Sequence, residues 1–90
     1  MVLTLPAVMT HAQALKAVLE LKAQVTSQAA DVVLDATALV QFDSSALAVM
    51  LACRRTALAA GKSFVVHGLP ARLSQLASLY GVAELVPAAP

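Results

Sequence analysis

The residues best suited to chemistry form a short polar break at positions 43–47, which read Asp-Ser-Ser-Ala-Leu. Asp43, Ser44 and Ser45 are residue types that cap a helix, because their short side-chain oxygens accept hydrogen bonds from the free N–H groups of the first turn. A serine there also offers an exposed hydroxyl, and a phosphate on it changes the local charge by about −1.5 to −2. Two interpretations stay open: the serines only cap the helix, or Ser44 is a phosphorylation site.

Other reactive side chains give little indication of catalysis. His11 and His67 are far apart in sequence and lack further ligands at zinc-binding spacing, and the single cysteine, Cys53, falls in an apolar helix pattern typical of packing. Asp35 and Asp43 would form a carboxylate pair if they met at the end of a strand, although aspartates that cap turns are commoner. No glycine-rich phosphate loop is present. We therefore expect no enzyme activity, no metal and no cofactor.

The composition points to a partner. The chain is 60% hydrophobic and only 12% charged, against about 45–50% apolar in typical soluble proteins. A domain of 90 residues cannot hide all of this surface, so we expect a partner to cover part of it. The net charge of +1 argues against nucleic acid as that partner.

The same features bear on the membrane and the compartment. The longest run without a polar residue spans residues 46–53, far short of the about 20 that a spanning helix needs. No basic region precedes the apolar start, so a signal peptide is not indicated. One cysteine excludes an intrachain disulfide, which fits a reducing, cytoplasmic setting.

Alternating strand and helix patterns predict one α/β domain over residues 1–86 and a tail at 87–90. Strands are expected at 2–9, 31–36 and 63–67, helices at 11–24, 46–60 and 71–79, and a last extended piece at 82–86. This strand-helix-strand-helix-strand-helix order implies a small, mixed but mainly parallel sheet with right-handed crossovers.

The helix patterns also predict which faces are buried. For the first helix we expect a core face of Leu15, Val18 and Leu19. The second helix is apolar on every side in its first two turns, which is typical of a helix with a second covered face. We assign Leu47, Met50, Leu51 and Leu58 to the sheet side, and Ala48, Val49 and Ala52 to an outer face that a partner covers.

A known family combines these features. The V-V-L-D of residues 32–35, then D-S-S-x-L leading into a long helix, then a strand, a glycine and a short helix, resemble the STAS domain of anti-sigma factor antagonists. The resemblance covers nearly the whole chain and implies the STAS fold. It also implies that the serine after the motif aspartate, Ser44, is a phosphorylation switch, although Ala46 stands where the family usually has glycine.

A closer resemblance is to one branch, the MlaB-type STAS subunit of the Mla phospholipid-transport ABC complexes of Gram-negative bacteria. It rests on Leu5-Pro6, the L-x-x-L-Y-G-V of residues 76–82, and the V-P at 86–87. This branch implies a non-catalytic cytoplasmic subunit, associated peripherally with the inner membrane, that binds and supports the transporter ATPase. The binding surface then comprises the residues at the start of the second helix and its outer face: Asp43, Ser44, Ser45, Ala48, Val49 and Ala52. The alternative is an anti-sigma factor antagonist, with a kinase as partner and Ser44 phosphorylated.

Overall fold

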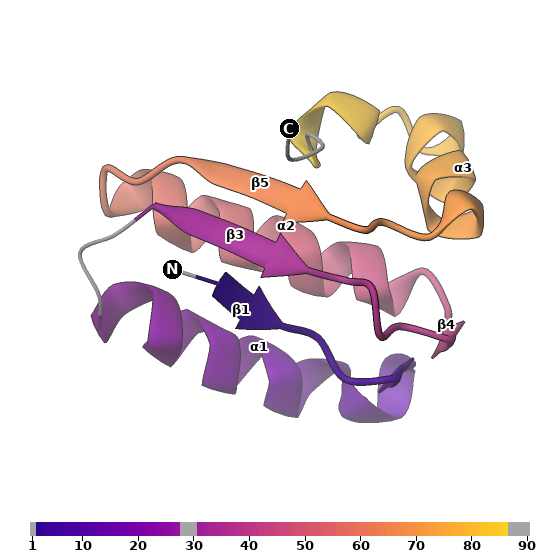
Figure 1. Cartoon of the computed structure of the whole chain (residues 1–90), viewed down its shortest axis with the longest axis horizontal. Coiled ribbons are helices and arrows are strands. Elements are labelled where there is room, and N and C mark those ends of the chain that lie inside the picture. Colours follow the sequence, from indigo (N-terminus) through magenta and orange to yellow (C-terminus); the bar gives the residue numbers. More distant parts are fainter. Residues whose placement is uncertain (1, 28–30, 87–90) are drawn as a thin grey trace.

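A parallel sheet of three strands forms the centre of the computed structural model, which describes residues 2–27 and 31–86 (Figure 1). The strands β1 (Val2–Thr4), β3 (Val32–Asp35) and β5 (Phe64–His67) lie in the order β1-β3-β5. The short strands β2 (Val8–Met9) and β4 (Gln41–Phe42) form a second parallel pair. The predicted α/β fold with mainly parallel strands is confirmed, whereas the predicted tail at 87–90 lies outside the described residues.

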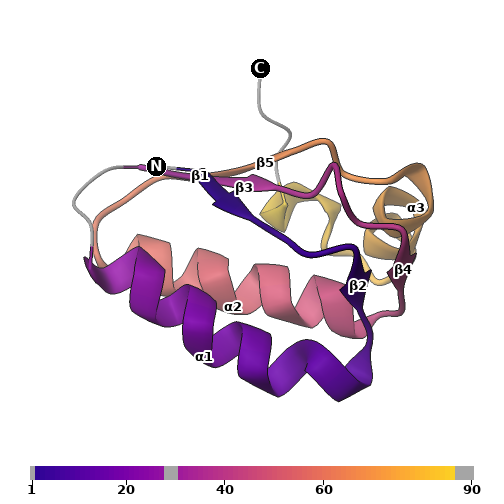
Figure 2. The ribbon, with the colours of Figure 1, turned by 60° about the horizontal axis from the view of Figure 1, so that its bottom comes forward.

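Two helices lie side by side on one face of the sheet (Figure 2). They are α1 (His11–Ser27) and α2 (Ser45–Ala59), each of which connects one strand of the sheet to the next. Helix α3 (Ala71–Leu79) lies beyond the carboxyl ends of the strands, and the 3-10 turn η1 (Ala83–Leu85) follows it. None of the described helices is long and apolar enough to cross a bilayer.

The core lies between the sheet and this helical layer. Leu3, Leu34 and Val66 are neighbours in the strand register and are all buried, because alternate residues of a strand point to the same face. Leu47 and Met50 of α2 are buried as predicted. Burying a side chain of this size stabilises the fold by about 1.5–3 kcal/mol.

The face that α1 turns to the core differs from the prediction. Leu21 and Val25 are buried, and Val18 is partly buried. Leu15 is 73% exposed and Leu19 is 63% exposed, so their assignment to the core is wrong. The spacing of apolar residues allows two overlapping stripes on α1, and the stripe that contains the smaller side chains is the one that packs inward.

The outer face predicted for α2 is also corrected. Ala48 is exposed, but Val49 is 0% exposed and Ala52 is 7% exposed. Helix α1 packs along the flank of α2 that carries them, so this chain covers that flank itself. Leu58, expected to face the sheet, is 46% exposed.

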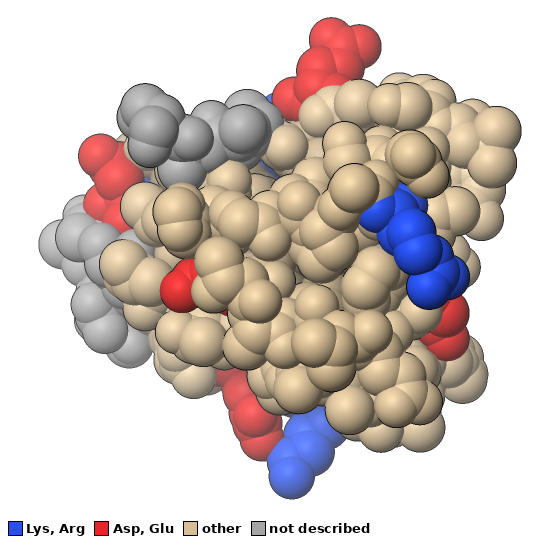
Figure 3. All heavy atoms as spheres, turned by 45° about the vertical axis from the view of Figure 1, so that its right-hand side comes forward, with Lys and Arg blue, Asp and Glu red and all other residues tan. Residues whose placement is uncertain are grey.

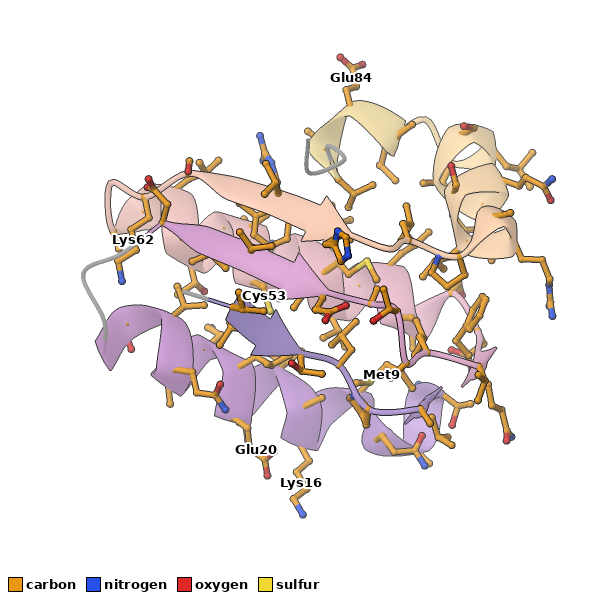
Figure 4. The ribbon with its side chains drawn as sticks, in the orientation of Figure 1. Met9, Lys16, Glu20, Cys53, Lys62 and Glu84 are labelled. Atoms are coloured by element: carbon orange, nitrogen blue, oxygen red, sulfur yellow. The ribbon has the colours of Figure 1, made fainter. Side chains whose placement is uncertain are left out.

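A lysine joins the carboxyl ends of the two long helices. Gly61, at φ +74, follows α2 as its C′ glycine, and the backbone N–H of Lys62 donates to the Ala57 carbonyl at 2.9 Å. The Lys62 side chain is then buried and its Nζ donates to the carbonyl of Val25 in α1 (Figure 4). This bond satisfies a carbonyl near the end of α1 and ties α1 to the start of β5.

The segment after α3 turns instead of extending. Gly81 adopts φ +72, and the N–H of Val82 donates to the Ala77 carbonyl at 2.9 Å. Residues 83–85 then form a 3-10 turn, in which the N–H of Leu85 donates to the Val82 carbonyl at 2.9 Å. The predicted extended piece at 82–86 is therefore wrong, because the reversal at the glycine directs the chain into a tight turn.

Candidate functional site

One carboxylate joins the amino ends of α1 and α2. Asp43 Oδ1 accepts a hydrogen bond from the Ser45 N–H at 2.8 Å, and its Oδ2 accepts one from the His11 N–H at 3.1 Å. Both donors are helix N-terminal amides, which favour a negative charge. The hydrogen bonds, first that from the Ser45 backbone, hold the pKa of Asp43 below its usual value. Asp43 is therefore ionised at neutral pH and fixes both helix starts in one place.

This arrangement changes the role predicted for Ser44. Ser44 already has helical backbone angles, φ −63 and ψ −16, and within the described residues its side chain makes no capping hydrogen bond. The Ala46 N–H instead bonds to the Asp43 carbonyl at 3.1 Å. The prediction that Ser44 caps the helix with its side chain is wrong, because Asp43 does so. The Ser44 hydroxyl is left exposed at the positive end of α2.

Strand β4 and helix α3 hold the residues just before this helix start. The Arg72 guanidinium lies 5.5 Å from the ring centroid of Phe42, close enough for a cation–π contact. Nearby in the chain, Val40 is exposed, and α3 ends with the exposed Leu79 and Tyr80. Figure 3 shows that the surface turned to the viewer consists mostly of uncharged residues, with charged side chains mainly at its margins.

The loop before β4 is positioned by a close approach to the end of β5. The Ala36 N–H donates to the His67 carbonyl at 2.8 Å. Gly68 follows at φ +70, and a Cβ there would collide with the Thr37 side chain. Glycine is thus required at this position both for its backbone angle and for the contact between the two loops.

The predicted binding residues fall into two groups. Asp43, Ser44 and Ala48 are exposed, and Ser45 is half-buried, all within the first turns of α2 or just before it. Val49 is fully buried, and Ala52 lines a hollow between α1 and α2, so neither lies on the surface at the start of α2. A binding face at the start of α2 therefore has four accessible members among the six predicted residues.

Asp35 and Asp43, the candidate carboxylate pair, each accept hydrogen bonds from a neighbouring turn or helix start. Asp35 Oδ1 accepts hydrogen bonds from the Thr37 hydroxyl at 2.6 Å and from the Thr37 N–H at 3.0 Å. These bonds lower the pKa of Asp35, as those from Ser45 and His11 lower the pKa of Asp43. Asp35 thus stabilises its own turn, and Asp43 stabilises the starts of α1 and α2.

The remaining reactive groups are also accounted for. Cys53 lies between the sheet and α2, and burial raises the pKa of its thiol to about 11, which leaves it unreactive (Figure 4). No three His, Cys, Asp or Glu side chains of the described residues gather as a metal site.

Two features of the site could not be found from the sequence. The bond from the His11 N–H to Asp43 joins residues distant in the chain, and any residue but proline supplies such a donor. The contact of Arg72 with Phe42 likewise depends on where α3 packs. Thr10 marks the start of α1, because its N–H and hydroxyl both donate to Gln13 Oε1.

Comparison with known families agrees with this architecture. The family model described as "Mlab, STAS domain" matches residues 1–87. No individual curated protein matches the chain. The match spans nearly the whole sequence, and the parallel sheet with α2 starting at the last residue of the D-S-S motif is the fold expected for it. The chain therefore belongs to the MlaB-type STAS domain family.

Proposed function

We propose that this chain is the non-catalytic subunit that binds and supports the ATPase of an ABC transporter for phospholipid, which maintains outer-membrane lipid asymmetry. Membership of the MlaB-type family is the observation that carries the proposal. In this function the chain is cytoplasmic and reaches the inner membrane only through the transporter complex. It performs no catalysis itself.

The start of α2 is the docking surface in this proposal. Ser44 and Ala48 are exposed one turn apart on the same side of the helix, and both side chains are small. Small residues let a partner backbone approach closely, and Asp43 keeps the helix start rigid through its two backbone hydrogen bonds. The partner would therefore meet a preorganised surface and lose little entropy on binding.

Calorimetric titration of the purified chain with the Mla-type ATPase subunit of the same genome tests the proposal. We expect binding of the unmodified chain and at least about tenfold weaker binding of Ser44→Lys, which corresponds to about 1.4 kcal/mol. Ala23→Lys adds the same charge at an exposed position near the other end of α1, and we expect it to bind normally. An unmodified chain that fails to bind the ATPase, or equal effects of the two lysines, would contradict the proposal.

A second candidate function is an anti-sigma factor antagonist controlled by phosphorylation of Ser44. The exposed Ser44 hydroxyl, which makes no capping bond within the described residues, supports it. A phosphate there would also sit at a helix N-terminus, where anions are stabilised. Incubation with the kinase of a neighbouring sigma-factor operon and ATP, followed by mass spectrometry, should give phosphate on Ser44 in this case. An unmodified Ser44 would exclude this function for that kinase.

A further inference from the structure

The outer face of the helical layer carries an exposed stripe on α1. Leu15, Leu19, Lys22 and Thr26 recur at intervals of three and four residues, so they share one side of the helix. The two leucines are among the most exposed large apolar residues of the described chain. Lys22 and Thr26, which continue the stripe, border α2. The stripe therefore runs along the seam between the two helices.

A hollow of about 400 Å³ opens at the carboxyl-terminal half of this seam. Lys22 and Thr26 line it from α1, and Arg55 and Thr56 line it from α2. Its remaining lining is alanine, including Ala52 and Ala59, whose small side chains leave the space open. The hollow thus combines an apolar floor with two cations and two hydroxyl-bearing side chains.

A second hollow lies on the other side of Arg55. It also measures about 400 Å³ and is lined by Ala48, Leu51 and Leu85 together with Arg54 and Arg55. Arg55 therefore stands between two depressions on the outer side of α2. Large apolar side chains of an occupant would fit the depressions while its acidic groups meet the arginines.

The charged side chains that line the two hollows are all cations. Among the described residues, no Asp or Glu lines either hollow. The one acidic residue of α1 is Glu20, and its Oε1 lies 3.8 Å from the Nζ of Lys16. Figure 4 shows both of these side chains extending from α1 away from α2. Lys22 and Arg55 have no carboxylate partner within the described residues, so an occupant with carboxylates complements them.

We propose that the seam between α1 and α2 binds an acidic amphipathic helix of a partner protein. Leucine-type side chains of that helix would pack against Leu15 and Leu19, and its carboxylates would pair with Lys22 and Arg55. From Leu15 to Thr26 the seam extends about 16 Å, which matches about three turns of such a helix. A helix laid in a groove between two helices is a common way to bury exposed leucines. A membrane surface fits less well, because it is flat and a few cations contribute only about 1 kcal/mol each to binding anionic lipid.

The seam lies away from the start of α2, and only the second hollow, through Ala48, borders the surface proposed there. Arg55 follows Ser44 by three helical turns, about 16 Å along the axis. The chain would thereby hold two partner segments at once, one at the amino end of α2 and one along its outer side. Ser44→Lys should leave helix binding in the seam unchanged, so failure of either site is visible separately.

Fluorescence anisotropy with a synthetic helical peptide of about 14 residues tests the proposal. The peptide carries leucines on one face and glutamates beside them. We expect the double variant Lys22→Glu/Arg55→Glu to bind at least about tenfold more weakly. The matched double variant Lys16→Glu/Arg72→Glu makes the same charge change away from the seam, and we expect less than about a twofold effect. Leu15→Ser/Leu19→Ser should also weaken binding, and circular dichroism checks that each variant is folded.

Several results would overturn the proposal. These are absence of binding to the glutamate peptide, equal binding of a peptide with lysines in place of the glutamates, and equal losses in the two double variants. Sedimentation with phosphatidylglycerol vesicles distinguishes a membrane from a protein helix. Vesicle binding that depends on Lys22 and Arg55, without peptide binding, would assign the seam to lipid and refute the helix.

Discussion

The substitution Val49→Ala tests the packing that defines which side of α2 is accessible. Val49 is fully buried on the flank of α2 that lies along α1, whereas the preceding residue, Ala48, is exposed. Removing two methyl-sized groups costs about 1.6 kcal/mol of transfer free energy at about 0.8 kcal/mol each. A residual cavity of about 40 Å³ adds about 1 kcal/mol. We therefore expect a loss of about 2–3 kcal/mol in the free energy of unfolding.

Urea unfolding followed by circular dichroism measures this loss, and thermal unfolding should show a fall of at least about 8 °C in Tm. Ala48→Ser is the matched control on the neighbouring residue. It faces solvent, so its cost should be within about 0.5 kcal/mol. If Val49→Ala were no more destabilising than Ala48→Ser, α1 would not cover this flank, and Val49 would return to the set of residues available to a partner.

Three further predictions concern the turns, the carboxylates and the thiol. Gly68→Ala should destabilise the fold by at least about 1–2 kcal/mol in urea unfolding, because alanine at φ +70 is strained and its Cβ meets Thr37; Gly61→Ala, with open space at its Cβ, should cost less. The pKa of Asp43 is lowered in the fold, so its stabilising contribution is present above the unfolded pKa near 3.8 and is lost as the pH falls through the folded value. Unfolding free energy should therefore fall below about pH 4, and less steeply in Asp43→Asn; equal slopes would contradict the two helix-start hydrogen bonds. The buried thiol of Cys53, with its pKa raised to about 11, should not react with a disulfide reagent at about pH 8 until urea unfolds the chain, and rapid reaction of the native protein would contradict its position.

Local sequence signals predicted the elements because each depends on near neighbours. Helix α3 spans Ala71–Leu79, the range that the sequence pattern predicted. Gly61 ends α2 because a C′ residue needs a left-handed backbone angle that glycine adopts without strain. The parallel sheet followed from the alternation of strands and helices, which leaves few other connections.

The sidedness of the helices could not be predicted, because it depends on how helices pack against each other. The sequence pattern assigned Leu15 and Leu19 to the core, yet the stripe with Leu21 and Val25 packs inward. The sequence pattern assigned Val49 to a surface for a partner, because nothing in the sequence showed that α1 packs along this flank of α2. The apolar excess of α2 is thus explained largely by the chain's own packing.

The sequence predicted where the candidate site lies but not which hydrogen bonds hold it together. The D-S-S motif does begin α2, and Ser44 is exposed there. The capping carboxylate is Asp43, which bonds to both His11 and Ser45 backbone amides and so organises two helices. A long-range hydrogen bond to a backbone amide cannot be predicted from residue type, because every residue except proline has such an amide. The sequence motif therefore marks where the helix starts, while the link between the helices emerges only from the fold.

Site-directed photo-crosslinking is the most direct measurement of docking through the start of α2. Because Cys53 is buried and unreactive, a Gln41→Cys variant of the native chain can be labelled selectively with a benzophenone maleimide at an exposed position two residues before Asp43, which leaves Ser44 and Ala48 unmodified. Ala23→Cys provides a label at an exposed position elsewhere on the molecule. On irradiation with the Mla-type ABC ATPase subunit, we expect an adduct of the chain and the ATPase from the Gln41→Cys label and little from the Ala23→Cys label. Adducts from Ala23→Cys alone, or from neither label, would contradict docking at this helix start.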